Sequence, residues 1–435
     1  MSFGGGSFVT QNKILPGVYV NVNQQGRVGS NLSDRGVAAL GLELDWGPDG
    51  EVFYLDAGEF RTRAQGLFGY AYGEDVLKGL RDLFLHAGGC YFYRLNSGVK
   101  ASCALCEAKY SGERGNALVI KVDADPEAEN GFVVLTFLAG QEVDSQQVVS
   151  AADLQDNDFV CWKSGAELTD GSYLQLTGGT NKAAVASEEY QKMLDLLEEY
   201  EFNVLGCLSM DNAVKTLLLK YTREQREENG RKFQTVLYDF AANYEGVISV
   251  GYPAQEEGLA ASASVYWLLG AEAGCAVNAT LTNAVYDGEI KVSALSGQRE
   301  LQQALLAGRL VLHRLHGELR VLEDVNSLQG WQESGQEDRR FNQTIRVLDQ
   351  IVLDLSGLFY QRYLGIVPND NAGRISLWGD VVAYFRKLEG LRAIESFDTA
   401  DVTVAPGENK KSVVIGVYLN VTNAMSQLYL TVTFA

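Results

Sequence analysis

The sequence predicts a multidomain protein of mixed α/β and α+β class, and three observations support this fold class. The chain has 435 residues, which is too long for one ordinary hydrophobic core. Strand-like and helix-like patterns alternate in two stretches, as expected for sheets covered by helices, and short alternating strands separate the two. The C-terminal part carries two long amphipathic helices followed by strands, which indicates an α+β domain.

These changes of pattern divide the chain into five parts. The short, closely spaced strands of the third part indicate a β-sandwich-like insertion. The expected parts are an N-terminal arm with a linker strand over 1–30, an α/β part of the core over 31–98, a β-rich insertion over 99–177, an α/β core domain over 178–328, and a C-terminal domain with a terminal strand arm over 329–435.

The N-terminal arm contains one isolated strand pattern, ILPGVYVNVN, between two polar segments. Val18 and Val20 fall on one face and Tyr19 on the other, and Val22 belongs to the same strand. A lone strand beside the polar segment NQQGRVGSNLSDRG is typical of a detachable arm rather than of a core element.

The two α/β stretches are defined by their apolar periodicity. The predicted strands are 36–44, 51–55, 90–95, 203–210, 233–240 and 246–252, and the predicted helices are 73–88, 187–202, 212–230, 258–274 and 299–308. Ser187 is the expected N-cap of its helix. A hairpin over 309–323 is expected to turn at His316-Gly317.

The C-terminal part begins with a helix over 341–365 and a second helix over 375–391, followed by strands over 412–421 and 427–435. In the last strand one face is apolar, and the other face holds Tyr429, Thr431 and Thr433. The apolar face consists of Leu428, Leu430, Val432 and Phe434. This strand needs a sheet to join. It pairs either with 412–421 of its own chain or with the sheet of another subunit.

Composition argues against several classes of partner. The formal net charge is -20, which disfavours nucleic-acid backbones and anionic membranes. No apolar run is long enough to span a bilayer, so no membrane insertion is expected. The opening MSFGGG lacks the basic and apolar regions of a secretory signal, so we expect synthesis in a cytoplasm.

The sequence offers no catalytic residues, metal ligands or cofactor site that fit a known arrangement. Cys103 and Cys106 form a C-x-x-C pair without two further ligands at zinc spacing, so buried free thiols are expected. His313 and His316 fall on opposite faces of a hairpin. The glycine-rich LTGGTNKA lacks the spacing of a phosphate-binding loop. An enzyme would therefore need an unrecognised active site.

Charge is distributed unevenly along the chain. From Arg339 onward there are ten basic and nine acidic residues, so this part is almost neutral while the rest is strongly acidic. Such a part either meets an acidic partner or is protected from self-repulsion. The alternative is that Arg386 and Lys387 only complement the C-terminus of their helix.

The C-terminal sequence resembles the C-terminal domain of contractile tail sheath proteins, which belong to myophages and phage-tail-like bacteriocins; this version is similar to those of Gram-positive hosts. The residues that carry the resemblance are NQTIRVLDQIVLDL and YLGIVPNDNAGRISLWGDVVAYFRKLEGLRAIESFDTADVTVAPGENKKSVVIGVYLNVTNAMSQLYLTVTF. The N-terminal LPGVYVNV resembles the arm strand of that family. LGLELDWGPDGEV, YFYRLNSG, YSGERGNALVIKV, LTGGTNKA and VNSLQGW are similar as well and occur in the family's order.

The resemblance implies a structural subunit without catalytic activity or cofactor. It implies a subtilisin-like α/β middle domain without a catalytic triad and a C-terminal domain that faces an inner tube. The implied partners are further copies of the chain in a helical homo-polymer built of hexameric rings, the inner tail tube protein, and baseplate and tail terminator proteins. The protein would be made in the bacterial host cytoplasm and reside in the tail of a phage or phage-tail-like particle.

Two hypotheses about assembly follow, and two alternative functions stay open. The strands of the two terminal arms would join the sheets of neighbouring subunits, while NQQGRVGSNLSDRG and APGENKK act as flexible connectors. Arg386, Lys387 and Arg392 would present a weak basic face to an acidic tube. The alternatives are a cytoplasmic α/β enzyme and a nanotube or capsid component that does not contract.

Overall fold

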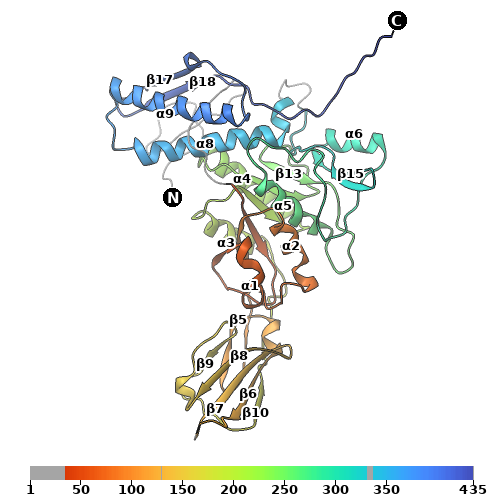
Figure 1. The fold of residues 1–435 in the computed structure, drawn as a ribbon, viewed down its shortest axis with the longest axis vertical. Coiled ribbons are helices and arrows are strands. Elements are labelled where there is room, and N and C mark those ends of the chain that lie inside the picture. The colour runs from red at the N-terminus through yellow and green to blue at the C-terminus, as the bar shows by residue number, and fades with distance from the viewer. Residues whose placement is uncertain (1–34, 129, 331–336, 435) are drawn as a thin grey trace. The chain divides into compact units, whose positions relative to one another are not determined.

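A computed structural model describes residues 35–128, 130–330 and 337–434 (Figure 1). The chain divides into two compact units, each made of segments that are distant in sequence. One unit comprises the described part of 1–39, then 79–88 and 200–434, and the other comprises 40–78 and 89–199. We call these the large unit and the small unit. Strand β1 (Val37–Leu42) runs from the large unit into the small unit.

The small unit begins with β2 (Val52–Asp56), α1 (Ala57–Phe68) and β3 (Gly89–Arg94), and β2 pairs antiparallel with β3. Helix α1 was not predicted, because its sequence alternates charged and apolar residues irregularly. Its ends are set locally: the Asp56 carboxylate accepts a hydrogen bond from the N–H of Gly58 at 2.8 Å, and Gly69 ends the helix in the left-handed region at a φ of 76°.

The insertion of the small unit consists of two antiparallel sheets that share one core. One sheet has the order β10-β6-β7-β8 and the other β4-β5-β9. Both contribute buried side chains to the same cluster, such as Ile120 and Val134 from the first and Ala108 and Val160 from the second. This arrangement agrees with the predicted sandwich-like insertion. The strands are β4 (Lys100–Ser102), β5 (Cys106–Ser111), β6 (Leu118–Ala124), β7 (Phe132–Leu138), β8 (Gln141–Val148), β9 (Val160–Trp162) and β10 (Ser172–Gln175), and α3 (Ser187–Leu197) follows them.

Within the large unit, β11 (Val204–Cys207), β12 (Gln234–Tyr238), β13 (Val247–Val250) and β14 (Arg309–Leu310) are parallel neighbours in that order. The helices α2 (Lys78–Phe84), α4 (Asn212–Glu227), α5 (Val265–Gly274) and α6 (Gln298–Leu306) accompany them. Helix α5 packs closely on α2, since a Cβ built on Gly270 would lie 2.1 Å from the carbonyl oxygen of Leu83. This close approach accounts for the glycine at position 270.

The predicted hairpin is present as β15 (Leu312–Leu315) and β16 (Glu318–Val321). It turns at His316 and Gly317, whose φ angles of 51° and 92° are those of a two-residue hairpin turn. Short 3₁₀ turns occur at Asp75–Leu77, Glu113–Ala117, Ala151–Asp153, Ala261–Ser264, Glu337–Arg340 and Thr399–Asp401.

The C-terminal part of the large unit consists of two long helices and a small sheet. Helices α8 (Asn342–Arg362) and α9 (Asn371–Gly390) lie side by side, and β17 (Val402–Pro406) and β18 (Val413–Val417) form an antiparallel pair (Figure 1). One apolar core joins them, with Val347 from α8, Phe385 from α9 and Val402 from β17. No helix in the described ranges is long and apolar enough to cross a membrane.

Three expectations about local structure were wrong, and one open alternative is decided. Helix α9 begins at Asn371 rather than at 375, because the Asp370 side chain caps it through the N–H of Gly373 at 2.8 Å. The N-cap of α3 is Ala186 rather than Ser187. The sequence left two pairings open for 427–435, and the one with 412–421 is absent: β18 pairs with β17, a strand that was not predicted. The segment APGENKK forms the end of β17 and the β17–β18 turn instead of a flexible connector.

Candidate assembly interface

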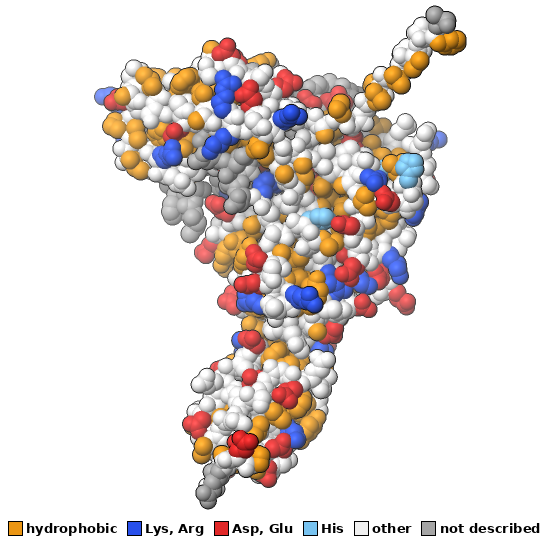
Figure 2. Space-filling view, viewed as in Figure 1, with side chains coloured by type: hydrophobic (Ala, Val, Ile, Leu, Met, Phe, Trp, Pro, Cys, Tyr) orange, Lys and Arg blue, Asp and Glu red, His pale blue; other side chains and the backbone are white. Residues whose placement is uncertain are grey.

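The C-terminal segment leaves the body of the large unit without joining any sheet of the described chain. Residues 422–434 form no regular secondary structure, and the segment projects away from the fold (Figure 1). The four side chains of its predicted apolar face are 75–94% exposed: Leu428, Leu430, Val432 and Phe434. Hydrophobic side chains follow one another along it (Figure 2). A stretch so apolar needs a partner surface to leave water.

Helix α8 holds the base of this segment through its first turn. The side-chain amide of Gln343 donates to the carbonyl oxygen of Thr422 at 3.2 Å, and its amide oxygen accepts from the N–H of Ala424 at 3.1 Å. The hydroxyl of Thr344 donates to the Asn423 side chain at 3.1 Å. The exit direction of the segment is therefore coupled to the position of α8.

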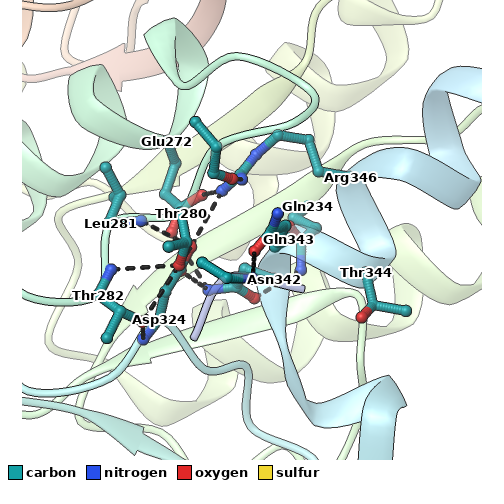
Figure 3. Close-up of polar contacts among 12 residues, drawn as sticks. Gln234, Glu272, Thr280, Leu281, Thr282, Asp324, Asn342, Gln343, Thr344 and Arg346 are labelled. Carbon is teal, nitrogen blue, oxygen red and sulfur yellow. Dashed lines mark hydrogen bonds and ion pairs between the residues drawn. The ribbon is translucent and has the colours of Figure 1, made fainter. Parts of the chain in front are cut away.

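The first turns of α8 are in turn fixed by a buried polar cluster (Figure 3). The guanidinium of Arg346 donates to a carboxyl oxygen of Glu272 on α5 at 2.6 Å and to the carbonyl oxygen of Ala279 at 2.7 Å. The Asn342 amide donates to Asp324 at 2.7 Å, and its oxygen accepts from Gln234 on β12 at 3.0 Å. These bonds tie α8 to a strand, a helix and a loop of the same unit.

Burial and mutual charge shift the titration of this cluster. Burial, together with the negative charge of Asp324, raises the pKa of Glu272 to about 8 despite the nearby Arg346. Burial alone would raise the pKa of Asp324, but Arg346 and hydrogen bonds from Glu272, Leu281 and Asn342 outweigh it and lower that pKa. At neutral pH, Glu272 therefore holds a proton and Asp324 carries the negative charge opposite Arg346.

A second buried ion pair joins α8 to α4. Arg226 and Asp349 make two parallel contacts, of 2.5 and 2.8 Å, with both side chains at most 9% exposed. Burial would lower the pKa of Arg226, but Asp349 raises it above its usual value. The planar guanidinium matches the carboxylate in this two-bond geometry, which sets the rotation of α8 about its axis.

The polar side of α8 was not predicted to be buried. The sequence pattern indicates an amphipathic helix and does not show whether its polar side is covered. The structure buries polar residues on α8 as well, among them Asn342, Arg346, Asp349 and Asp354. Asn342, Arg346 and Asp349 are separated by four and three residues, which places them along one side of a helix, and this spacing was the available signal.

The three residues of the hypothesised basic face lie at and just beyond the C-terminal end of α9, and all three are exposed. The Arg386 guanidinium pairs with Glu389 at 2.7 Å and lies 4.6 Å from the centre of the Phe397 ring. Arg392 adopts a left-handed backbone with φ of 58°. Part of the charge of this face is thus compensated by a neighbouring carboxylate. The strand residues Val18, Tyr19, Val20 and Val22 lie outside the described residues.

Possible metal ligands are scattered in the described part of the chain. No three His, Cys, Asp or Glu residues there gather in a way that could hold a metal ion. The cysteines in the described ranges are free thiols; Cys106 is buried as expected, but Cys103 is only partly buried.

Comparison with known proteins identifies the family. The model of the phage tail sheath C-terminal domain matches residues 334–435, that of the phage tail sheath protein central domain matches 183–327, and that of the phage tail sheath protein β-sandwich domain matches 96–181. The crystal structure of a sheath tail protein from Desulfitobacterium hafniense is 30% identical, covers 93% of this chain and 96% of its own, and gives a TM-score of 0.80. The chain belongs to the phage tail sheath family.

Two further structures support the shared fold. A sheath tail protein from Listeria innocua is 28% identical, with 91% of this chain and 94% of its own covered and a TM-score of 0.78. The helical sheath of the anti-feeding prophage in its contracted state is only 13% identical but covers 97% of this chain and 99% of its own with a TM-score of 0.59. The tail sheath fold therefore extends over nearly the whole chain.

Proposed function

We propose that this sheath protein polymerises helically around an inner tube through exchanged N- and C-terminal strands, and that the polymer contracts to drive the tube through a cell envelope. The observation that carries the proposal is the exposed apolar C-terminal segment, anchored at its base to α8. The anti-feeding prophage protein, solved as a contracted helical sheath, shares the fold.

Strand addition explains how such a segment would bind. Each main-chain hydrogen bond to a neighbour's sheet edge contributes about 0.5–1.5 kcal/mol net, and each apolar side chain that becomes fully buried contributes about 1.5–3 kcal/mol. Four side chains of the segment are available for burial: Leu428, Leu430, Val432 and Phe434. Part of this gain is lost in ordering the segment. The remainder holds a subunit in place and still allows it to pivot.

The two-stranded β17–β18 sheet is the proposed acceptor. Within the described residues it consists of these two strands only, so each strand has one edge without a partner strand. A two-stranded sheet gains stability from further strands. The terminal segment of one neighbour and the Val18–Val22 arm of another would complete it. A contact between two different surfaces does not close on itself and so builds a helix.

The remaining parts of the proposal concern partners and location. Stacked hexameric rings would surround the tail tube, with baseplate and terminator proteins at the two ends. The C-terminal domain would face the tube through Arg386, Lys387 and Arg392. The five-part domain division and a subtilisin-like central domain without a triad complete the proposed plan. The subunit would be made in the host cytoplasm and function in the particle's tail.

Electron microscopy of the purified protein, alone and with its tube protein, tests the proposal. Hollow striated cylinders that occur in a long narrow and a short wide form are expected. Cylinders of one diameter under all conditions would instead indicate a nanotube that does not contract. Dispersed particles that turn over a substrate would contradict the structural role and favour an enzyme.

A further inference from the structure

Cys103 and Cys106 flank the tight turn that joins β4 to β5 in the small unit. The N–H of Cys103 donates to the carbonyl oxygen of Cys106 at 2.9 Å, and the two Sγ atoms lie 3.6 Å apart. Cys106 is buried, while Cys103 is partly exposed. Since a disulfide bond is about 2.05 Å long, small side-chain rotations bring these two sulfurs to bonding distance.

The surroundings of the pair make its two thiols unequal. A hydrogen bond from the Cys106 thiol, backbone N–H groups of Cys106 and Leu105, and the charge of Lys163 together outweigh burial and lower the pKa of Cys103 to about 6. The same thiol–thiol hydrogen bond, with burial, raises the pKa of Cys106. The accessible sulfur is thus a thiolate at neutral pH and the buried sulfur a neutral thiol. Attacking and resolving cysteines of dithiol sites differ in this way.

We propose that Cys103 and Cys106 form a redox-active dithiol, which low-molecular-weight disulfides oxidise to an intramolecular disulfide across the β4–β5 turn. The Cys103 thiolate attacks one sulfur of the small disulfide, a mixed disulfide forms, and one small thiolate leaves and takes a proton from water. The Cys106 sulfur then releases its proton to water and attacks the Cys103 sulfur, and the expelled second small thiolate takes up a proton from water. The two cysteines lose two electrons, and the small disulfide is reduced to two thiols.

The second step is favoured once the first has occurred. The hydrogen bond to the Cys103 thiolate is the largest cause that raises the pKa of Cys106. Formation of the mixed disulfide removes that thiolate charge, so Cys106 becomes easier to deprotonate at the moment when it must attack. The sulfurs are held in contact by the turn, which gives the intramolecular attack a high effective concentration.

A neighbouring thiol provides a matched control. In the register between β5 and β9, Cys106 lies opposite Trp162 and Glu107 lies opposite Cys161. Because successive side chains on a strand point to opposite faces, Cys161 points away from the Cys103–Cys106 pair. Burial also raises the pKa of Cys161, so this thiol lacks the activation of Cys103.

Incubation of the reduced full-length protein with glutathione disulfide at pH 7, followed by intact-mass measurement and peptide mapping, tests the proposal. The expected product has lost two hydrogens, about 2 Da, in the peptide that holds Cys103 and Cys106, and carries no stable glutathione. Cys106→Ala should instead accumulate a glutathione adduct on Cys103. Cys161→Ser should behave like the unaltered protein.

The pH profile of Cys103 alkylation by iodoacetamide provides a second readout. Its midpoint should lie near 6 in the unaltered protein and rise by at least about 1 pH unit in Cys106→Ala. A stable glutathione adduct on the unaltered protein, no reaction at Cys103, or a disulfide that includes Cys161 would overturn the proposal. Peptide mapping of the unaltered protein tests the proposal even if the Cys106→Ala variant does not fold.

Discussion

Replacing Glu272 with glutamine should remove a large pH-dependent contribution to the stability of the large unit. Glu272 has its pKa raised from 4.5 to about 8 by burial beside Asp324. Between these values the unfolded chain has lost this proton while the folded chain retains it, so the unfolded state binds fewer protons. Stability therefore falls as the pH rises from about 4.5 to about 8 and levels off above that.

The magnitude follows from the shift. About 3.5 pKa units at about 1.36 kcal/mol each give an upper limit of about 5 kcal/mol at high pH. Glutamine can accept from Arg346 and donate to Asp324, as protonated Glu272 does, but it cannot ionise. The stability difference between Glu272→Gln and the unaltered protein should therefore shift in favour of the variant by about 2.5 kcal/mol between pH 6 and pH 8.5. Asp324 does not contribute to this difference, because its pKa is lowered from 3.8 and its protonation therefore changes only below the pH range compared.

Urea denaturation at pH 6.0, 7.0 and 8.5 measures this difference, at concentrations where sedimentation shows a monomer. Glu201→Gln, at an exposed position, serves as the control, and this variant should show the same pH dependence of the free energy of unfolding as the unaltered protein. A stability difference that stays constant with pH would refute the reasoning, because Glu272 would then not hold a proton in the folded protein at neutral pH.

Three further predictions concern α8, the C-terminal segment and the basic face. Arg226→Met should lower the free energy of unfolding by about 3–5 kcal/mol, because Asp349 is left buried without its counter-charge. The double variant Arg226→Met with Asp349→Leu should recover most of this loss in the same urea assay. Equal losses in the single and the double variant would contradict the ion-pair account. Leu430→Asp with Val432→Asp should abolish polymers in sedimentation, while the free energy of unfolding changes by less than about 0.5 kcal/mol because both side chains are exposed in the monomer. Thr431→Asp with Thr433→Asp, on the other face of the strand, should weaken assembly far less. Equal effects of the two double variants would argue against a one-sided apolar face. Changing Arg386, Lys387 and Arg392 to Glu should reduce assembly on the tube protein in micrographs, most strongly at low salt. Normal extended sheath on the tube would contradict the proposal that these residues face the tube.

Sequence periodicity predicted the strands whose pairing partners lie nearby in the sequence. The hairpin at His316-Gly317 was predicted because its turn residues and flanking strands are adjacent in sequence. The sandwich-like insertion was predicted because strands such as Leu118–Ala124 alternate regularly. Helix α1 was missed because its limits depend on the side-chain cap at Asp56 and the left-handed Gly69 rather than on an apolar stripe.

The buried side of α8 could not be read from hydrophobicity. An apolar stripe shows which face of a helix packs, but it does not show whether the opposite, polar face is also covered. Arg346 and Asp349 are buried because their partners come from residues far away in the chain: Glu272 accepts a hydrogen bond from Arg346, and Arg226 supplies the counter-charge of Asp349. The spacing of the polar residues hinted at a second face, but the sequence alone did not supply the partners.

The C-terminal segment shows the opposite case. Its alternation predicts a strand, yet in the single chain it lies exposed and outside any sheet. Strand β18 instead pairs with β17, whose five residues, VTVAP, were too short and too close to a proline to stand out. A strand pattern without a sheet is what a segment that joins another subunit requires.

Deletion of Gln427 to Ala435 tests this central claim most directly. The segment is exposed and its anchored base at 422–424 is retained, so the truncated protein should unfold at the same urea concentration as the full chain. Sedimentation and electron microscopy should show folded monomers where the full chain forms cylinders. Cylinders formed by the truncated protein would contradict the proposal that this strand joins the subunits.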